Sequence, residues 1–210
     1  MRLMDVLPDY EIKRLSRAPI LSDEDRRHYF KLDPPIEELI KPAREPHNKI
    51  GIWLNYIYFK VSGRFYNQEH FRPYDIRMAA KILGVAHPKE FTAQYSDRTR
   101  QKHRLCVVEY CGYTEFPKAE EVFENIVKDL VASQMHPRKL FYVVMEALRN
   151  KKIEVPSYDR IARSMTQKFN TFEKDAWQNI SQVITSAQAE ALDQLTSTAG
   201  EEYQRPLLTR

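Results

Sequence analysis

The sequence predicts an all-α, multi-helix protein with two small helical subdomains and helix-turn-helix-like units. Only 5 of the 210 residues are glycine, whereas β-rich chains of this size usually need more. Apolar residues recur at intervals of three and four along most of the chain, which is typical of amphipathic helices. Hydrophobic residues make up 42% of the chain, which is enough to form a core.

The first helices are marked by their caps and breaks. Ser22 and Asp25 have the spacing of a capping box at a helix start. A Pro-Pro pair at 34–35 interrupts the pattern, and a short helix is expected at 36–41. The next helix is the clearest, because its apolar residues recur at intervals of three and four from residue 50 to 61. Ser62-Gly63 supplies its stop, since the glycine can adopt a positive φ. Its apolar stripe is expected to face the core and consists of Ile50, Trp53, Leu54, Ile57, Tyr58 and Val61.

A helix-turn-helix-like unit is expected at 73–94. Pro73 suits the first turn of a helix, which ends in the sequence AAKILGV at 79–85. Gly84 turns the chain, and a second short helix is expected within 87–96. This shape occurs in many DNA-binding proteins, and also in helical proteins that do not touch DNA.

The segment 96–111 changes character along its axis. Its first half is basic all round the helical wheel, and its second half is mostly apolar. Such a helix is expected to be anchored in the core at one end and to present its cations to phosphates at the other. The basic half contains Arg98, Arg100, Lys102, His103 and Arg104.

The expected junction between the two subdomains lies at 112–116. We therefore divide the chain into an N-terminal helical subdomain at 1–112, a second helical subdomain at 113–196 and a tail or linker at 197–210. Helices of the second subdomain are expected to start at Pro117, at Pro137, after Ser157, near Phe172 and after Ser186.

No pattern in the sequence indicates an enzyme. The chain has no Gly-rich phosphate loop and none of the named catalytic motifs. His103, Cys106 and Cys111 could supply three metal ligands, but a fourth is missing and the spacing matches no usual zinc pattern, so we interpret the cysteines as buried and structural. We expect no catalytic residue, metal, cofactor or small-molecule substrate.

The expected location is the cytoplasm. Two cysteines in a chain of 210 residues favour a reducing compartment over a disulfide scaffold. No segment has the apolar core of a signal peptide, and no stretch is apolar over the length needed to cross a membrane.

The distribution of charge points to a polyanionic partner more clearly than the net charge of +4 does. Residues 98–104 are basic without an acid, 115–131 are net acidic and 136–174 are net basic. Tyr95 and Tyr158 lie beside the basic clusters, where hydroxyl groups suit sugar-phosphate contacts. Because no strands are expected to stack unpaired bases, double-stranded DNA is favoured over RNA. The second basic cluster consists of Arg149, Lys151, Lys152, Arg160, Arg163 and Lys168.

Four segments resemble, in order, the N-terminal region of Tn3-family transposases. HNKIGIWLNYIYFKVSGRF at 47–65 is similar to that family's Asn-Arg-Leu-Gly-Phe…Tyr-Leu-x-x-x-Gly-Arg-Phe stretch. AAKILGV followed by Tyr95-x-x-Arg98-x-x-x-x-His103 resembles a second family segment. KKIEVPSYDRI at 151–161 and ITSAQAEALDQL at 184–195 resemble two more.

The resemblance implies a bacterial, nucleoid-associated chain that recognises the terminal inverted repeats of a transposon. The family's catalytic acidic triad and RNase-H-like domain have no counterpart here, so the chain is expected to bind double-stranded DNA without cutting it. Other transposase subunits are a second candidate partner. The expected DNA-binding residues are Asn48, Lys49, Tyr95, Arg98, Arg100, Lys102, His103, Arg104, Lys151, Lys152, Tyr158, Arg160, Arg163 and Lys168.

One departure from the family pattern and two alternatives remain. Relatives have arginine where this chain has Lys49, and a lysine offers a point charge rather than a two-pronged donor, so base reading at this position is in doubt. The chain could instead be a helical protein-interaction or assembly module, which would show exposed apolar patches. It could also be a helix-turn-helix regulator unrelated to transposons, which would require a dimer matching palindromic half-sites.

Overall fold

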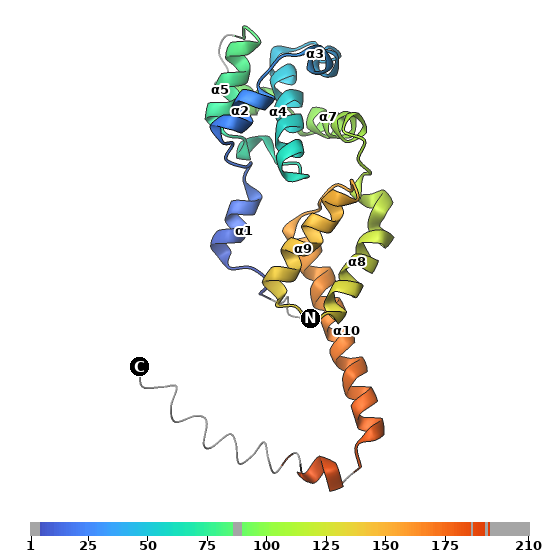
Figure 1. Ribbon diagram of the computed structural model, residues 1–210. Helices are drawn as coiled ribbons and strands as arrows, with labels where there is room; N and C mark the ends of the chain where they lie inside the picture. Colours follow the sequence, from blue (N-terminus) through green and yellow to red (C-terminus); the bar gives the residue numbers. More distant parts are fainter. Residues whose placement is uncertain (1–4, 86–89, 186, 192, 194–210) are drawn as a thin grey trace, which may run out of the picture. The chain divides into compact units, whose positions relative to one another are not determined.

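The computed structural model describes residues 5–85, 90–185, 187–191 and 193, and it confirms the all-α, multi-helix fold class (Figure 1). Within these residues the only extended pairing is a parallel bridge between Thr114 and Ile153. None of the described helices combines the length and the apolar character needed to span a membrane. The elements are α1 Asp9–Ser16, α2 Asp23–Tyr29, α3 Pro34–Ile40, α4 Pro46–Ser62, η1 Gln68–His70, α5 Pro73–Ile82, α6 Phe91–Gln94, α7 Asp97–Tyr110, η3 Phe116–Ala119, α8 Glu120–Ala132, α9 Pro137–Asn150 and α10 Tyr158–Val183.

The chain divides into two compact units, Met1–Thr166 and Gln167–Arg210. The boundary expected between residues 112 and 113 falls inside the first unit, and the subdivision of that unit remains a prediction. Backbone contacts cross this position, since the Val155 amide donates to the Gly63 carbonyl at 2.9 Å.

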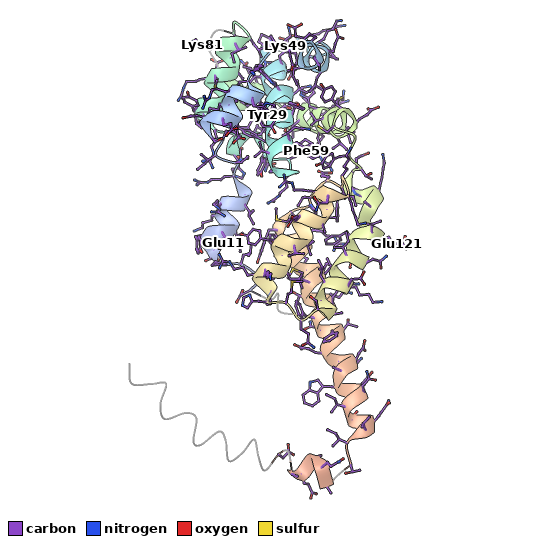
Figure 2. The ribbon with its side chains drawn as sticks, in the orientation of Figure 1. Glu11, Tyr29, Lys49, Phe59, Lys81 and Glu121 are labelled. Carbon is purple, nitrogen blue, oxygen red and sulfur yellow. The ribbon has the colours of Figure 1, made fainter. Side chains whose placement is uncertain are left out.

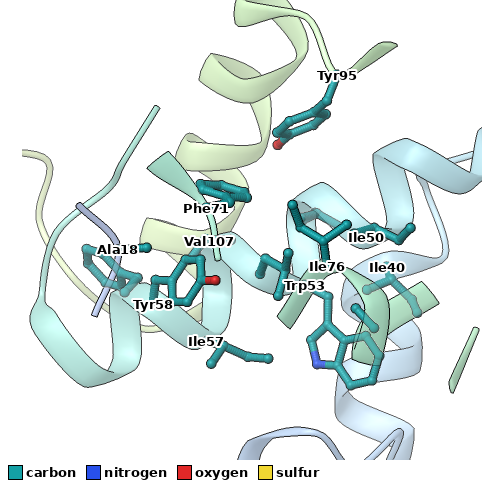
Figure 3. Packing of buried hydrophobic residues seen from close by; sticks show 14 of the residues in the cluster. Ala18, Ile40, Ile50, Trp53, Ile57, Tyr58, Phe71, Ile76, Tyr95 and Val107 are labelled. Carbon is teal, nitrogen blue, oxygen red and sulfur yellow. The ribbon is translucent and has the colours of Figure 1, made fainter. Parts of the chain in front are cut away.

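The core of the first unit forms around α4. Pro46 occupies the first turn, where the missing amide hydrogen costs nothing, and Gly63 ends the helix with a φ of 71°. The predicted apolar stripe is confirmed, because five of its six side chains are buried and Val61 packs against the same core. Figure 3 shows residues of this stripe surrounded by side chains from α3, α5 and α7.

The predicted helix-turn-helix-like unit contains both expected helices, and its second helix is very short. α5 ends before Gly84, whose φ is 67°, and the neighbouring residues 86–89 lie outside the described part of the chain. α6 has only four residues, and Ser96 then caps the 14-residue α7 by accepting a hydrogen bond from the Thr99 amide. The helix long enough to lie in a DNA groove is therefore α7 rather than α6.

The helices after residue 116 follow the predicted starts with two corrections. α9 begins at Pro137 as expected, whereas Pro117 lies in the 3-10 helix η3 and α8 begins at Glu120. Two helices were expected after Ser157, yet α10 is one continuous helix of 26 residues. No glycine or proline interrupts its sequence, so nothing favours a break near Phe172. The cap expected at Ser186 lies outside the described residues.

Candidate nucleic-acid interface

One face of α7 presents cations to solvent. Arg98 and Lys102 are exposed, and neither forms an ion pair with a residue that the structure describes. Gln101 and Leu105 are also exposed and follow Arg98 at intervals of three and seven residues, so the four side chains share one helical face. We call these four residues the α7 face.

The C-terminal part of α7 is anchored in the core. Val107 and Val108 are buried there, and α7 packs along α4. This agrees in part with the predicted change of polarity along the helix. The difference is that the apolar half is not fully buried, because Leu105 is 46% and Tyr110 is 42% exposed.

Tyr95 and His103, two predicted DNA contacts, instead position α7 on α4. Tyr95 is fully buried; its hydroxyl accepts a hydrogen bond from Asn55 Nδ2 at 2.8 Å and lies 2.9 Å from His103 Nδ1. Burial lowers the pKa of the imidazole to about 4, so the ring is neutral at neutral pH. Gly51 makes room for this arrangement, since a Cβ there would lie 2.4 Å from the Tyr95 ring.

Arg104 is occupied by an ion pair within the protein. Its Nε donates to Glu154 Oε1 at 2.7 Å and its Nη2 donates to the other carboxylate oxygen. The same carboxylate accepts a hydrogen bond from the Phe116 amide at 3.2 Å. Glu154 is buried, and its hydrogen bonds and charge raise the pKa of the Arg104 guanidinium. Arg104 therefore joins α7 to the segment after α9.

Two further predicted cations also have acidic partners. Arg100 pairs with Asp97 one helical turn before it, at 3.2 Å. Arg160 pairs with Glu120 at 2.6 Å and with Glu124 at 2.8 Å, which joins the start of α10 to α8. These arginines are less available to phosphates than Arg98 and Lys102 are.

A second exposed cationic group lies at the end of α9. Lys151 and Lys152 are exposed, and neither pairs with a described acid. The carbonyl of Lys152 accepts a hydrogen bond from the Thr114 amide at 2.8 Å, which brings this turn to the chain that follows α7. Arg163 is exposed on α10, one turn beyond the ion-paired Arg160.

The remaining predicted residues lie elsewhere. Asn48 and Lys49 are half-buried in the first turns of α4, and Lys49 lines a cavity of about 710 Å³; Figure 2 places it at the end of α4 opposite to Phe59. Tyr158 is half-buried with its ring 5.5 Å from that of Phe141. Lys168 belongs to the second unit. The predicted set is thus divided among several places rather than gathered on one surface.

The cysteines differ from their predicted role. Cys106 is exposed and Cys111 is half-buried, so neither is a fully buried structural residue. Burial nevertheless raises the pKa of the Cys111 thiol to about 11, which leaves it uncharged at neutral pH. Among the described residues, no three metal-ligating side chains lie close enough together to hold an ion.

Two members of the α7 face were missed by the sequence analysis. Gln101 and Leu105 carry no positive charge, so the distribution of basic residues does not indicate them. Their spacing from Arg98 was the available signal, because residues three, four and seven positions apart lie on one side of a helix.

A comparison with protein families gives one finding. The model of a family described as a domain of unknown function, DUF4158, matches residues 6–167. The match covers all of the described helices from α1 to α9 and the first part of α10. It therefore includes the α7 face and the turn at Lys151 and Lys152.

Proposed function

Since this chain belongs to the DUF4158 family of domains of unknown function, we propose that it is a DNA-binding module that recognises transposon ends without cutting them. The observation that carries the proposal is the α7 face, on which Arg98 and Lys102 are exposed and have no ion pair to a described residue. The choice of transposon ends as the DNA rests on the resemblance of four segments to Tn3-family transposases.

The dimensions and chemistry of α7 suit a DNA groove. The major groove is about 12 Å wide and admits an α-helix, and a helix of this length extends over about 21 Å. Arginine and lysine bind the acceptors of guanine, glutamine binds adenine, and an apolar side chain can contact the methyl group of thymine. Arg98, Gln101, Lys102 and Leu105 together present these donors and contacts on one face.

The turn after α9 offers contacts to the DNA backbone. Lys151 and Lys152 are exposed at a helix end that lies against Thr114, close in the chain to the end of α7. Lysine ammonium groups bind phosphates as point charges and fix the position of the protein without reading sequence. We assign both base reading and phosphate contacts to the α7 face, and phosphate contacts alone to this turn.

The proposal is tested by fluorescence anisotropy of labelled duplexes. A duplex with the terminal inverted repeat should bind more tightly than a scrambled duplex of equal length, and the logarithm of the association constant should fall linearly with that of the salt concentration. The double variant Arg98→Ala/Lys102→Ala should flatten this line by up to about 0.9 per lost phosphate contact.

Lys13→Ala/Arg14→Ala is the matched control. Lys13 and Arg14 are exposed on α1, away from the α7 face, and their removal lowers the net charge by the same two units as the double α7 variant. It should leave the salt dependence unchanged. Equal binding of the repeat and scrambled duplexes at physiological salt would refute sequence recognition, and an unchanged slope for the double variant would refute the role of the α7 face.

A further inference from the structure

The part of α10 in the second unit carries an apolar stripe that is half-buried at Phe169, Phe172 and Ala176 and exposed at its C-terminal end. Ile180 is 45% and Val183 is 80% exposed, and the neighbouring Trp177 is 70% exposed. Apolar side chains of this size at helical spacing are typical of a surface that packs against another helix. The α10 stripe consists of Phe169, Phe172, Ala176, Ile180 and Val183.

We propose that the α10 stripe is the interface of a homodimer in which two copies of α10 pack antiparallel and cross at Ala176. A dimer with twofold symmetry uses the same patch on both copies, so the patch must be complementary to itself. The inference goes beyond the proposed DNA binding and is independent of it, because the α7 face belongs to the first unit.

The order of side chains in the stripe provides this complementarity. With Ala176 on the twofold axis, Phe169 of one copy lies opposite Val183 of the other, and Phe172 lies opposite Ile180. Each aromatic ring therefore faces a β-branched side chain, and the helices stay evenly spaced along their contact. A parallel pair would put two layers of phenylalanine at one end and two layers of smaller side chains at the other, so the helices would diverge.

The size of Ala176 suits the crossing point. Packed helices approach to about 8–10 Å between their axes, depending on the side chains at the contact, and a small residue permits the shorter distance. The larger side chains lie on both sides of it at intervals of three or four residues. Antiparallel helices also align their dipoles favourably.

The charges of this stretch favour the same arrangement. Lys168, Glu173, Lys174 and Asp175 all lie in its first half, whereas 176–185 contains no charged residue. An antiparallel pair places the charged half of one helix beside the uncharged half of the other. In a parallel pair each charged side chain would lie level with the same residue of the other helix, where like charges repel.

The length of the stripe sets the expected strength of the dimer. From Phe169 to Val183 the helix rises about 21 Å, at about 1.5 Å per residue. A contact between two helices of this length lies at the low end of specific interface sizes. We therefore expect a dimer that dissociates on dilution rather than a permanent one.

Cysteine cross-linking of the full chain tests the register. In a Cys106→Ser/Cys111→Ser background, the single variant Ala176→Cys should form a disulfide-linked dimer on mild oxidation, because the position opposes itself. Phe172→Cys and Ile180→Cys should cross-link to each other when mixed and much less when each is alone. Gln178→Cys, on the opposite side of the helix, is the control and should stay monomeric.

Sedimentation equilibrium over a range of concentrations tests the dimer without cysteines. The unmodified chain should gain mass with concentration, and Ile180→Asp should abolish the gain, whereas Gln178→Asp introduces the same charge on the polar side and should retain it. Circular dichroism checks that both variants keep their helices. A chain that stays monomeric at the highest soluble concentration overturns the proposal. Cross-linking of Phe172→Cys mainly with itself overturns the antiparallel register.

Discussion

Arg104 and Glu154 form a two-pronged ion pair across 50 residues of sequence, with Nε 2.7 Å from Oε1. The carboxylate is buried and also accepts a hydrogen bond from the Phe116 amide, so it connects α7, the start of η3 and the segment after α9. The pair keeps α7 in place relative to this segment. It also withdraws one arginine of the basic cluster at 98–104 from contact with a ligand.

Arg104→Ala should destabilise the protein by about 3 kcal/mol, because it leaves a buried carboxylate without its cation. Urea denaturation measures this loss. The salt dependence of DNA binding by the folded variant should stay that of the parent, in contrast to Arg98→Ala/Lys102→Ala. Lys41→Ala, which breaks an exposed pair with Glu38, is the control and should cost less than about 1 kcal/mol. A flattened salt dependence for Arg104→Ala would show that the guanidinium reaches DNA.

The low pKa of His103 predicts a loss of stability in mild acid. Burial lowers the pKa of the folded imidazole to about 4, whereas the unfolded ring has a pKa of about 6.5. Between these values the unfolded chain binds a proton that the folded chain does not. The free energy of unfolding must therefore decrease as the pH falls through this range, and it is fully recovered above it.

Carboxylates also make the free energy of unfolding depend on pH in acid, and His103→Gln separates the contribution of the imidazole from theirs. The variant lacks the titrating ring, so its free energy of unfolding should fall less than that of the parent between about pH 7 and about pH 5. Urea denaturation at the two pH values gives the comparison. Equal losses in both proteins would mean that His103 is protonated in the folded chain, contrary to its half-buried position beside the Tyr95 hydroxyl.

Gly51→Ala should destabilise the packing of α7 on α4 by about 2 kcal/mol, as is typical of an overfilled core. The added Cβ would lie 2.4 Å from two carbons of the Tyr95 ring, and this ring cannot easily move because it stacks on Phe91 and binds Asn55. The double variant Gly51→Ala/Tyr95→Leu should cost less than the sum of its single changes, measured as free energies of unfolding. If the free-energy losses of the two single variants simply add in the double variant, the strain does not come from the contact with the Tyr95 ring.

The buried face of a helix could be predicted from the sequence where the spacing of apolar residues within that helix is enough to define it. The stripe of α4 follows from spacing alone, because its apolar residues recur at intervals of three and four. The roles of the cations could not be predicted in the same way. Arg104 and Arg160 find acids 50 and 36–40 residues away, and periodicity says nothing about which distant element meets a given helix face.

Tyr95 shows the same limit for aromatic residues. Its position beside a basic cluster suggested a DNA contact, whereas it is fully buried against Gly51. A glycine within a helix can mark the close approach of another side chain, but the sequence does not name that side chain. The exposed members of the α7 face were only partly found, since a search for charge cannot find Gln101 or Leu105.

The backbone at Lys152 allows its charge to be removed without a cost to the fold. After α9 the Ile153 amide donates to the Leu148 carbonyl and the Lys152 amide to that of Arg149, both at 2.9 Å, which places Lys152 at a left-handed position with a φ of 53°. Glycine is preferred at such a position, and Gly112 fills the equivalent place after α7 with a φ of 65°. Lys152→Gly should therefore keep the free energy of unfolding within about 1 kcal/mol of the parent value.

The same variant should weaken binding to repeat and scrambled duplexes equally, because a phosphate contact carries no sequence information. The slope of log association constant against log salt should fall by about 0.9, measured by fluorescence anisotropy. Gln134→Gly is the matched control: Gln134 follows α8 with a φ of 54°, so the change has the same effect on the backbone without altering charge. If both variants bind DNA as the parent does, Lys152 is not a phosphate contact. If both bind weakly, the backbone change rather than the lost charge is responsible.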